Sequence, residues 1–175
     1  MFALTGCSAL GSTGDKGYIS GDGQIVQYHP ADRDDPVELT GTSLEDTPLD
    51  VTDYRGKVVV LVVWAAWCAP CAREAPDLAA AATELGGVAQ FVGIDIRDNQ
   101  ANAQAFVRNY EITYPSVFDP DGRALLGFPN GLGPRTIPAF AVLDKQGRVA
   151  ATIRGELPSK LTLVDLVEEI AAEDG

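Results

Sequence analysis

The feature that most constrains the fold is an apolar run at residues 57–63, which leads directly into Trp-Ala-Ala-Trp-Cys-Ala-Pro-Cys at residues 64–71. Five of the seven residues in the run are valine, which is typical of a central strand buried on both faces. We expect a helix after Trp67 that stops at the paired glycines 86–87, because glycine is favoured just beyond a helix C-terminus. The chain is therefore predicted to pass from a buried strand into a helix at two closely spaced cysteines.

The rest of the chain alternates between predicted strands and helices. Strands are expected at residues 24–28, 37–40, 88–95 and 116–118, and a hairpin is expected to join residues 139–143 to residues 148–154. Helices are expected over residues 99–110 with Asp98 as the cap, briefly over residues 123–128, and from Ser159 or Thr162 towards the C-terminus. This order predicts an α/β fold with parallel crossovers, one antiparallel hairpin and helices on both faces of a mixed sheet.

The composition excludes several classes of protein. The chain has 175 residues, the size of one ordinary domain, and 46% of them are hydrophobic, as in globular proteins. Thirteen Lys and Arg against 25 Asp and Glu leave a formal net charge of −12, and a phosphate backbone would repel such a surface. The longest apolar run, residues 58–67, is too short to span a bilayer. We therefore expect a monomer with no transmembrane helix and no nucleic-acid partner.

The first 23 residues form a separate predicted region, and residues 24–175 are predicted to form a single domain. The sequence Leu-Thr-Gly-Cys at residues 4–7 resembles the bacterial lipobox, and residues 8–23 contain five Gly and three Ser, as a flexible linker does. Such a linker would span about 22 Å. We expect that the signal begins upstream of Met1 and that a lipidated Cys7 anchors the protein to the outer face of the cell membrane. The alternative is a stray cysteine on a short apolar tail.

The cysteine pair, Cys68 and Cys71, carries the predicted chemistry. Two cysteines three positions apart at a helix start can bring their sulfurs within bonding distance. The free N–H groups and the dipole of a helix N-terminus favour a thiolate, which makes Cys68 the predicted nucleophile. Cys71 lies one turn inside the helix, should be less exposed and suits the resolving role. Pro70 fits the first helical turn, where its missing N–H costs little.

Metal-binding and purely structural roles for this pair have less support. A zinc site needs four ligands, and the chain adds only Cys7 and His29 to the pair. A structural disulfide that closes so short a loop would be unusual, because strained bridges are the labile ones. A Cu(I) site could use both thiolates but should add a histidine, and we expect His29 to lie at the surface. We therefore expect a redox-active disulfide with no metal and no cofactor.

The motif Trp-x-x-Trp-Cys-x-x-Cys after a valine-rich strand, followed at a distance by Thr-Ile-Pro at residues 136–138, resembles the thioredoxin superfamily. More narrowly, residues 37–173 resemble the TlpA/ResA-like extracytoplasmic thiol-disulfide oxidoreductases. The resemblance implies a thioredoxin-like fold in which Pro138 is a cis-proline beside the two sulfurs. An ordinary trans proline is the alternative. A substrate peptide would then contact the turn and the proline loop at Trp67, Ala69, Pro70, Thr136 and Ile137.

Two details favour the ResA-like branch of that superfamily. Thioredoxins carry a buried Asp six residues before the first cysteine, where this chain has Val62. ResA-like proteins carry an active-site Glu three residues after the second cysteine, where this chain has Glu74. At that spacing the carboxyl faces the same side of the helix as Cys71 and could take its proton. The alternative is a solvated surface Glu beside Arg73.

Two further segments also resemble that branch. The sequence before residue 57 resembles its N-terminal β-hairpin extension, and residues 95–119 resemble its central βα insertion.

The resemblance implies an enzyme that reduces disulfides in exported proteins, for example apocytochrome c, and is recharged by a membrane thiol-disulfide relay protein. Two alternatives remain on the same fold. One is a thiol oxidase that donates its disulfide to secreted proteins, since the direction depends on the reduction potential. The other is a Cu(I)-binding carrier without enzymatic activity. A peroxidase lacks support, because Ala65 stands where peroxiredoxins carry a Thr three residues before the reactive cysteine.

Overall fold

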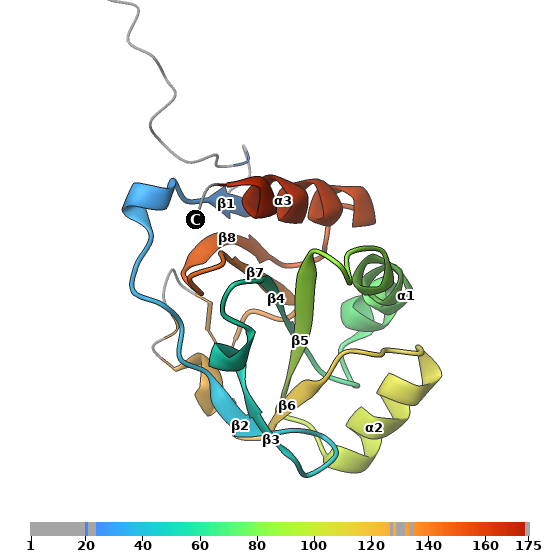
Figure 1. The fold of residues 1–175 in the computed structure, drawn as a ribbon. Coiled ribbons are helices and arrows are strands. Elements are labelled where there is room, and N and C mark those ends of the chain that lie inside the picture. Colours follow the sequence, from blue (N-terminus) through green and yellow to red (C-terminus); the bar gives the residue numbers. More distant parts are fainter. Residues whose placement is uncertain (1–19, 21–23, 127, 129–131, 134, 174–175) are drawn as a thin grey trace, which may run out of the picture.

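The computed structural model describes residues 20, 24–126, 128, 132–133 and 135–173. Cys7 and nearly all of the predicted linker lie outside these residues. In chain order the elements are β1 (Ile25–Gln27), η2 (Pro30–Asp32), β2 (Thr40–Thr42), β3 (Pro48–Asp50), η3 (Val51–Tyr54), β4 (Val58–Trp64), α1 (Ala69–Glu84), β5 (Ala89–Ile96), α2 (Gln100–Asn109), β6 (Ser116–Asp119), η4 (Arg123–Leu125), β7 (Ala139–Leu143), β8 (Val149–Arg154) and α3 (Lys160–Ala172) (Figure 1). Among the described residues, no helix is both long and apolar enough to cross a membrane.

Six strands form one mixed sheet in the order β1-β8-β7-β4-β5-β6. The strands β4, β5 and β6 are parallel, whereas β7 runs antiparallel to both β4 and β8. All seven residues of β4 are buried, as the valine-rich run predicts, because this strand lies in the middle of the sheet with both faces covered. The structure confirms the α/β fold, the mixed sheet and the β7–β8 hairpin.

All three α-helices pack on one face of the sheet. One buried cluster joins the sheet residues Val60, Phe91 and Phe140 to Leu78 of α1, Phe106 of α2 and Ile170 of α3. The expectation of helices on both faces is wrong, because β4, β5 and β6 follow one another in the same direction across the sheet. Two right-handed crossovers in the same direction place both connecting helices on the same side.

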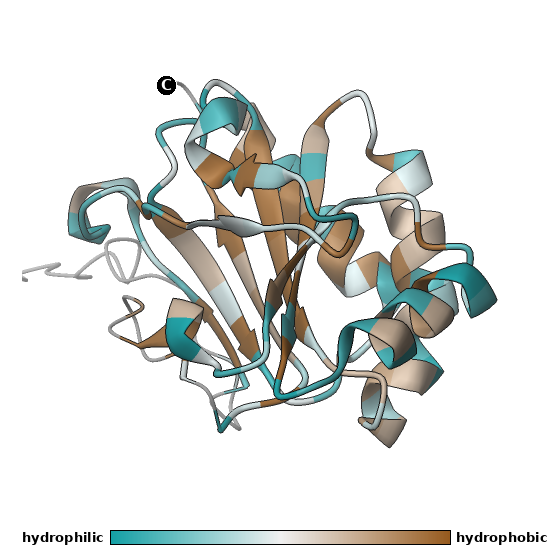
Figure 2. Cartoon of the chain, turned by 90° about the horizontal axis from the view of Figure 1, so that it is seen from below, coloured by the Kyte–Doolittle hydropathy of each residue, from teal (hydrophilic) through white to brown (hydrophobic). Residues whose placement is uncertain are grey.

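The second face of the sheet is covered by the N-terminal segment and the region after β6. Val37, Leu39 and Leu49 pack there with Leu125 against residues such as Leu61 of β4. Figure 2 shows the hydrophobic strands enclosed between the helices and this second layer. In place of the helix expected over residues 123–128, the structure has the three-residue 3-10 turn η4.

The N-terminal hairpin exists but uses other residues than the sequence suggested. Of residues 37–40, only Thr40 belongs to a strand, as the first residue of β2, and β2 pairs with β3 as a small separate sheet. Strand β1, predicted at residues 24–28, adds to the edge of the main sheet beside β8. The central insertion is confirmed, since α2 and the edge strand β6 extend the sheet beyond β5.

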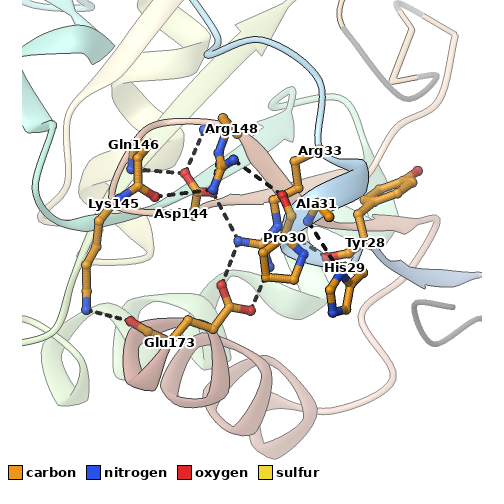
Figure 3. A network of polar contacts seen from close by, with 10 residues as sticks. All are labelled: Tyr28, His29, Pro30, Ala31, Arg33, Asp144, Lys145, Gln146, Arg148 and Glu173. Atoms are coloured by element: carbon orange, nitrogen blue, oxygen red, sulfur yellow. Dashed lines mark hydrogen bonds and ion pairs between the residues drawn. The ribbon is translucent and has the colours of Figure 1, made fainter. Parts of the chain in front are cut away.

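A buried ionic cluster lies at the end of the sheet opposite the cysteines (Figure 3). The Arg33 guanidinium donates to Asp144 Oδ2 at 3.0 Å and to both carboxylate oxygens of Glu173 at 2.6 Å. The side chains of Arg33 and Asp144 are only 1% and 3% exposed. This cluster ties the segment after β1 to the β7–β8 turn and to the end of α3.

Candidate active site

The two cysteines lie where β4 ends and α1 begins. Cys68 is the N-cap of α1, and its Sγ accepts a hydrogen bond from the backbone N–H of Cys71 at 3.2 Å. The sulfurs form a disulfide with an S–S distance of 2.05 Å. Cys68 and Cys71 are 4% and 3% exposed, so the expected contrast in exposure is nearly absent in this form. In the reduced protein, a thiolate at Cys68 would lie against the N–H groups that begin the helix.

Glu74 lies behind the disulfide and is not a surface residue. It is 8% exposed, and it lines a small cavity together with Cys71 and Pro138. The cavity measures about 10 Å³, which is close to the minimum for one water molecule. Burial raises the pKa of Glu74 to about 7, although a hydrogen bond from the Leu157 N–H to Oε1 opposes that shift. A carboxyl group with this pKa can take or give a proton near neutral pH.

The proline loop contributes the third part of the site. The peptide bond between Ile137 and Pro138 is cis, as predicted. The carbonyl of Pro138 accepts a hydrogen bond from the N–H of Gly155 at 3.0 Å, and Gly155 has a φ of +85°, which favours glycine. Within the described part of the chain, no hydrogen bond engages the backbone of Ile137. This backbone is therefore left available for an incoming peptide.

The predicted substrate residues surround the disulfide to different degrees. Ala69 is exposed, while Pro70, Thr136 and Ile137 are half-buried. Trp67 is 54% exposed, and its indole N–H donates to the carbonyl of Arg97 at 2.9 Å rather than to any group of the proline loop. Half of residues 130–135, which precede that loop, lie outside the described residues.

An open groove of about 490 Å³ runs beside residues 65–68, which we call the redox turn. Ala66, Trp67 and Ala72 line one side of the groove, and Phe106 and Tyr110 of α2 line the other. The central insertion thus forms one wall of a surface depression next to Trp67.

The structure also reveals a buried acid that the sequence analysis missed. Asp95 is the penultimate residue of β5 and has no exposed surface, and burial raises its pKa to about 8. Its neighbour Asp98 does not cap α2 as predicted; Asn99 does, while Asp98 Oδ2 accepts the N–H of Ala66 at 2.6 Å. An Asp at the carboxyl end of a parallel strand is the sequence signal that would have singled out Asp95, since reactive groups collect there in α/β folds.

The remaining candidates lie away from the redox turn or in the core. Trp64 is buried and stacks on Phe106 with ring centroids 4.7 Å apart. His29 is exposed, and its Nδ1 accepts the N–H of Ala31. Among the described residues, no three His, Cys, Asp or Glu side chains form a group that could hold a metal ion.

Known proteins share this sequence pattern and fold. The thiol-disulfide oxidoreductase ResA of Geobacillus thermodenitrificans is 33% identical over 121 residues, which are 66% of this chain and 65% of that relative. The chain thus matches just under two thirds of that protein's length. A secreted thiol-disulfide isomerase of Corynebacterium glutamicum superposes with a TM-score of 0.81 at 32% identity, over 90% of this chain and 98% of that one. A DsbF homologue of Corynebacterium diphtheriae superposes with a TM-score of 0.77 at 34% identity, over 88% and 98% of the two chains.

The fold, the Cys68–Cys71 disulfide and these similarities together define a thiol-disulfide oxidoreductase of the thioredoxin-like class. The model of the AhpC/TSA family matches residues 34–152, about two thirds of the chain. The chain therefore belongs to the AhpC/TSA family.

Proposed function

We propose that this protein reduces disulfides in exported proteins through the Cys68–Cys71 pair. The observation that carries the proposal is the position of Glu74, whose buried carboxyl shares a cavity with Cys71 behind the disulfide. A reductase must deprotonate its second cysteine to release each client. A carboxyl with a pKa of about 7 is suited to accept that proton at neutral pH.

The proposed reaction has two exchange steps. The thiolate of Cys68 attacks one sulfur of the client disulfide, which forms a mixed disulfide and releases the first client sulfur as a thiolate. Cys71 gives its proton to Glu74 and attacks the sulfur of Cys68. The bond between Cys68 and the client breaks, the second client thiolate leaves, and the Cys68–Cys71 disulfide forms. Two electrons have then passed from the dithiol to the client.

The client is held beside the sulfurs by the proline loop and the redox turn. The unengaged backbone of Ile137 would pair with an extended client segment, as resemblance to the thioredoxin superfamily implies. The exposed indole of Trp67 would cover apolar client side chains next to the reacting cysteine. Exported proteins with cysteine pairs form the proposed client class, with apocytochrome c as the specific candidate from the ResA-like resemblance.

The proposed location is the outer face of the cell membrane. The similar structures include a secreted isomerase, and the sequence at residues 4–7 resembles a lipobox. A membrane thiol-disulfide relay protein would return electrons to the oxidised pair. Intact-mass spectrometry of protein from the native membrane tests the anchor, and an unmodified Cys7 with Met1 retained would contradict it.

The main experiment uses three cysteine variants. Cys68→Ser should abolish insulin-disulfide reduction, and Cys71→Ser should accumulate mixed disulfides with client proteins, because the resolving step is lost. Cys7→Ser removes the third cysteine of the chain and should leave insulin reduction unchanged, which makes it the matched control. Retention of activity by Cys68→Ser would overturn the proposal.

The second candidate function is the reverse reaction, in which the disulfide oxidises secreted clients. This second candidate is supported by the similarity to a secreted thiol-disulfide isomerase. A glutathione redox titration of the pair separates the two. A potential near −270 mV, as in thioredoxin, supports the reductase, whereas a potential near −120 mV, as in DsbA, supports the oxidase.

A further inference from the structure

The redox turn is hydrogen-bonded to a second turn, at residues 97–98, which follows β5. Ala66 N–H donates to Asp98 Oδ2 at 2.6 Å, and Trp67 Nε1 donates to the carbonyl of Arg97 at 2.9 Å. The guanidinium carbon of Arg97 lies 5.3 Å from the centre of the Trp67 ring. Arg97 adopts a φ of +53° to make these contacts, a conformation that is uncommon for a residue with a side chain. The position of the turn that carries Cys68 therefore depends on residues 97–98.

Asp98 is held by donors on both of its carboxylate oxygens. Oδ2 accepts the N–H of Ala66, and Oδ1 accepts the N–H of Asn99 at 2.8 Å. Both oxygens of Asp98 therefore already accept a backbone N–H.

Asp95 lies in the opposite situation. It has no exposed surface, and no N–H or O–H group of the described residues donates to either of its oxygens. The neighbouring strands carry two buried donors, Trp64 Nε1 and Ser116 Oγ. Both lie close to Gly93, and neither forms a hydrogen bond with Asp95. Its side-chain hydrogen-bond partner is Asp98. A hydrogen bond between two carboxyl groups requires a proton on one of them, and here Asp95 must carry it.

We propose that Asp95 and Asp98 form a proton-sharing pair that positions the redox turn, and that loss of the shared proton at alkaline pH loosens this turn. Both residues are positioning residues, because they act on Cys68 through the backbone of Ala66 and Trp67. The inference deepens the proposed function and rests on it for its effect on turnover.

The surroundings of Asp95 explain why the proton is retained. Burial, together with the negative charges of Asp98 and Asp119, raises the pKa of Asp95 to about 8. The charged groups around it are Asp98 on the same turn, Asp119 at the end of β6, and Arg97, whose guanidinium lies over Trp67. Strand β4 presents Trp64 and no charge. When the proton leaves, two carboxylates face each other in a buried site, and Asp98 is repelled from its place beside Ala66.

The test follows the oxidised protein, in which neither cysteine titrates. Carbon-13 NMR of the Asp95 carboxyl should show a midpoint near pH 8, and the indole N–H signal of Trp67 should shift with the same midpoint. Asp95→Asn keeps a donor towards Asp98 at every pH and should remove the shift of the Trp67 signal. Asp121→Asn makes the same charge change at an exposed acid of the β6–η4 turn and should leave the shift in place.

A Trp67 signal that does not move between pH 6 and 10, or that still moves in Asp95→Asn, would overturn the proposal. The direct titration of Asp95 needs no variant, so the proposal can be tested even if Asp95→Asn does not fold. A midpoint below pH 6 for the Asp95 carboxyl would refute the proposal. Glu74→Gln should keep the transition, which assigns it to the Asp pair.

Turnover supplies the second readout. From pH 7.5 to 9.5, insulin reduction by the unaltered protein should fall roughly tenfold relative to Asp95→Asn, the factor that loss of one charge-assisted hydrogen bond corresponds to. If the NMR transition is present but no variant reduces insulin, the proposed function fails and the coupling stands. If insulin reduction depends on Cys68 but has the same pH profile in both proteins, the coupling fails and the proposed function stands.

Discussion

At one end of the sheet, Asp144 accepts four hydrogen bonds, two from backbone N–H groups and two from the guanidinium groups of Arg33 and Arg148. At the other end, Glu74 and Asp95 are also buried, and no cation among the described residues bonds to either of them. Burial acts to raise the pKa of Asp144 as well, but the bonds from Arg148 and Arg33 outweigh it and the pKa is lowered. The pKa values of Glu74 and Asp95 are raised to about 7 and about 8. The comparison shows that a buried carboxyl with cationic partners, such as Asp144, stays ionised and stabilises the fold through its ion pairs. A buried carboxyl without such partners, such as Glu74 or Asp95, holds a proton near neutral pH.

The largest effect is expected from Arg33→Met, which removes one of the two cations that bond to Asp144. It leaves the buried Asp144 with less compensation, and breaking a buried pair in this way costs about 3–5 kcal/mol. The free energy of unfolding, measured by urea denaturation, should fall by that amount, while insulin reduction at 20 °C persists. An exposed pair, Arg123 with Asp121, gives the control, since Arg123→Met should change stability little. Equal losses in both variants would contradict the comparison.

Glu74→Gln should change how stability depends on pH at the redox end. The pKa of Glu74 rises from 4.5 to about 7 on folding, so its stabilising contribution is complete below about pH 4.5 and is lost as the pH rises to 7. Between these values the unaltered protein should lose about 3 kcal/mol more than the variant. Urea denaturation at pH 4.5 and pH 7.5 measures the difference. Parallel pH profiles would show that Glu74 titrates as an ordinary surface acid.

Gly155→Ala should separate backbone strain from function. Gly155 has a φ of +85° beside the cis-proline, and Gly56 has a φ of +89° just before β4, at the other end of the sheet. An alanine in either position should cost about 1–2 kcal/mol of stability, because the left-handed conformation is unfavourable for residues with a Cβ. Only Gly155→Ala should also slow insulin reduction, since its N–H holds the carbonyl of Pro138. Equal activity in the two variants would remove Gly155 from the site.

The smallest effect is expected from Arg73→Gln. Arg73 pairs with Glu156 at 2.7 Å, but both side chains are more than half exposed, so stability should change by less than about 0.5 kcal/mol. Its charge lowers the pKa of Glu74, so the variant should move the midpoint of the Glu74 carboxyl, followed by carbon-13 NMR, to slightly higher pH. Lys160→Gln breaks the similarly exposed pair with Glu84 and should leave that midpoint in place.

The amino-acid sequence by itself determined the parts of this protein that depend on neighbouring residues. The valine-rich run predicted the buried strand β4, and the spacing of Cys68 and Cys71 placed both sulfurs at a helix start. The cis form of the Ile137–Pro138 bond was implied by the resemblance of the motif to the thioredoxin superfamily. Glu74 could also be proposed, because the resemblance to ResA-like proteins implies an acid at this position and its separation from Cys71 places it on the same side of one helix.

Only the tertiary structure decided which acids are buried and what faces them. Leu157 meets Glu74 from 83 residues away, Asp98 meets Ala66 from 32 residues away, and Asp144 meets Arg33 from 111 residues away. A carboxyl group's pKa depends on burial and on such distant neighbours, which no local pattern encodes. The same holds for the helices, since the order of strands in the sheet placed all three on one face.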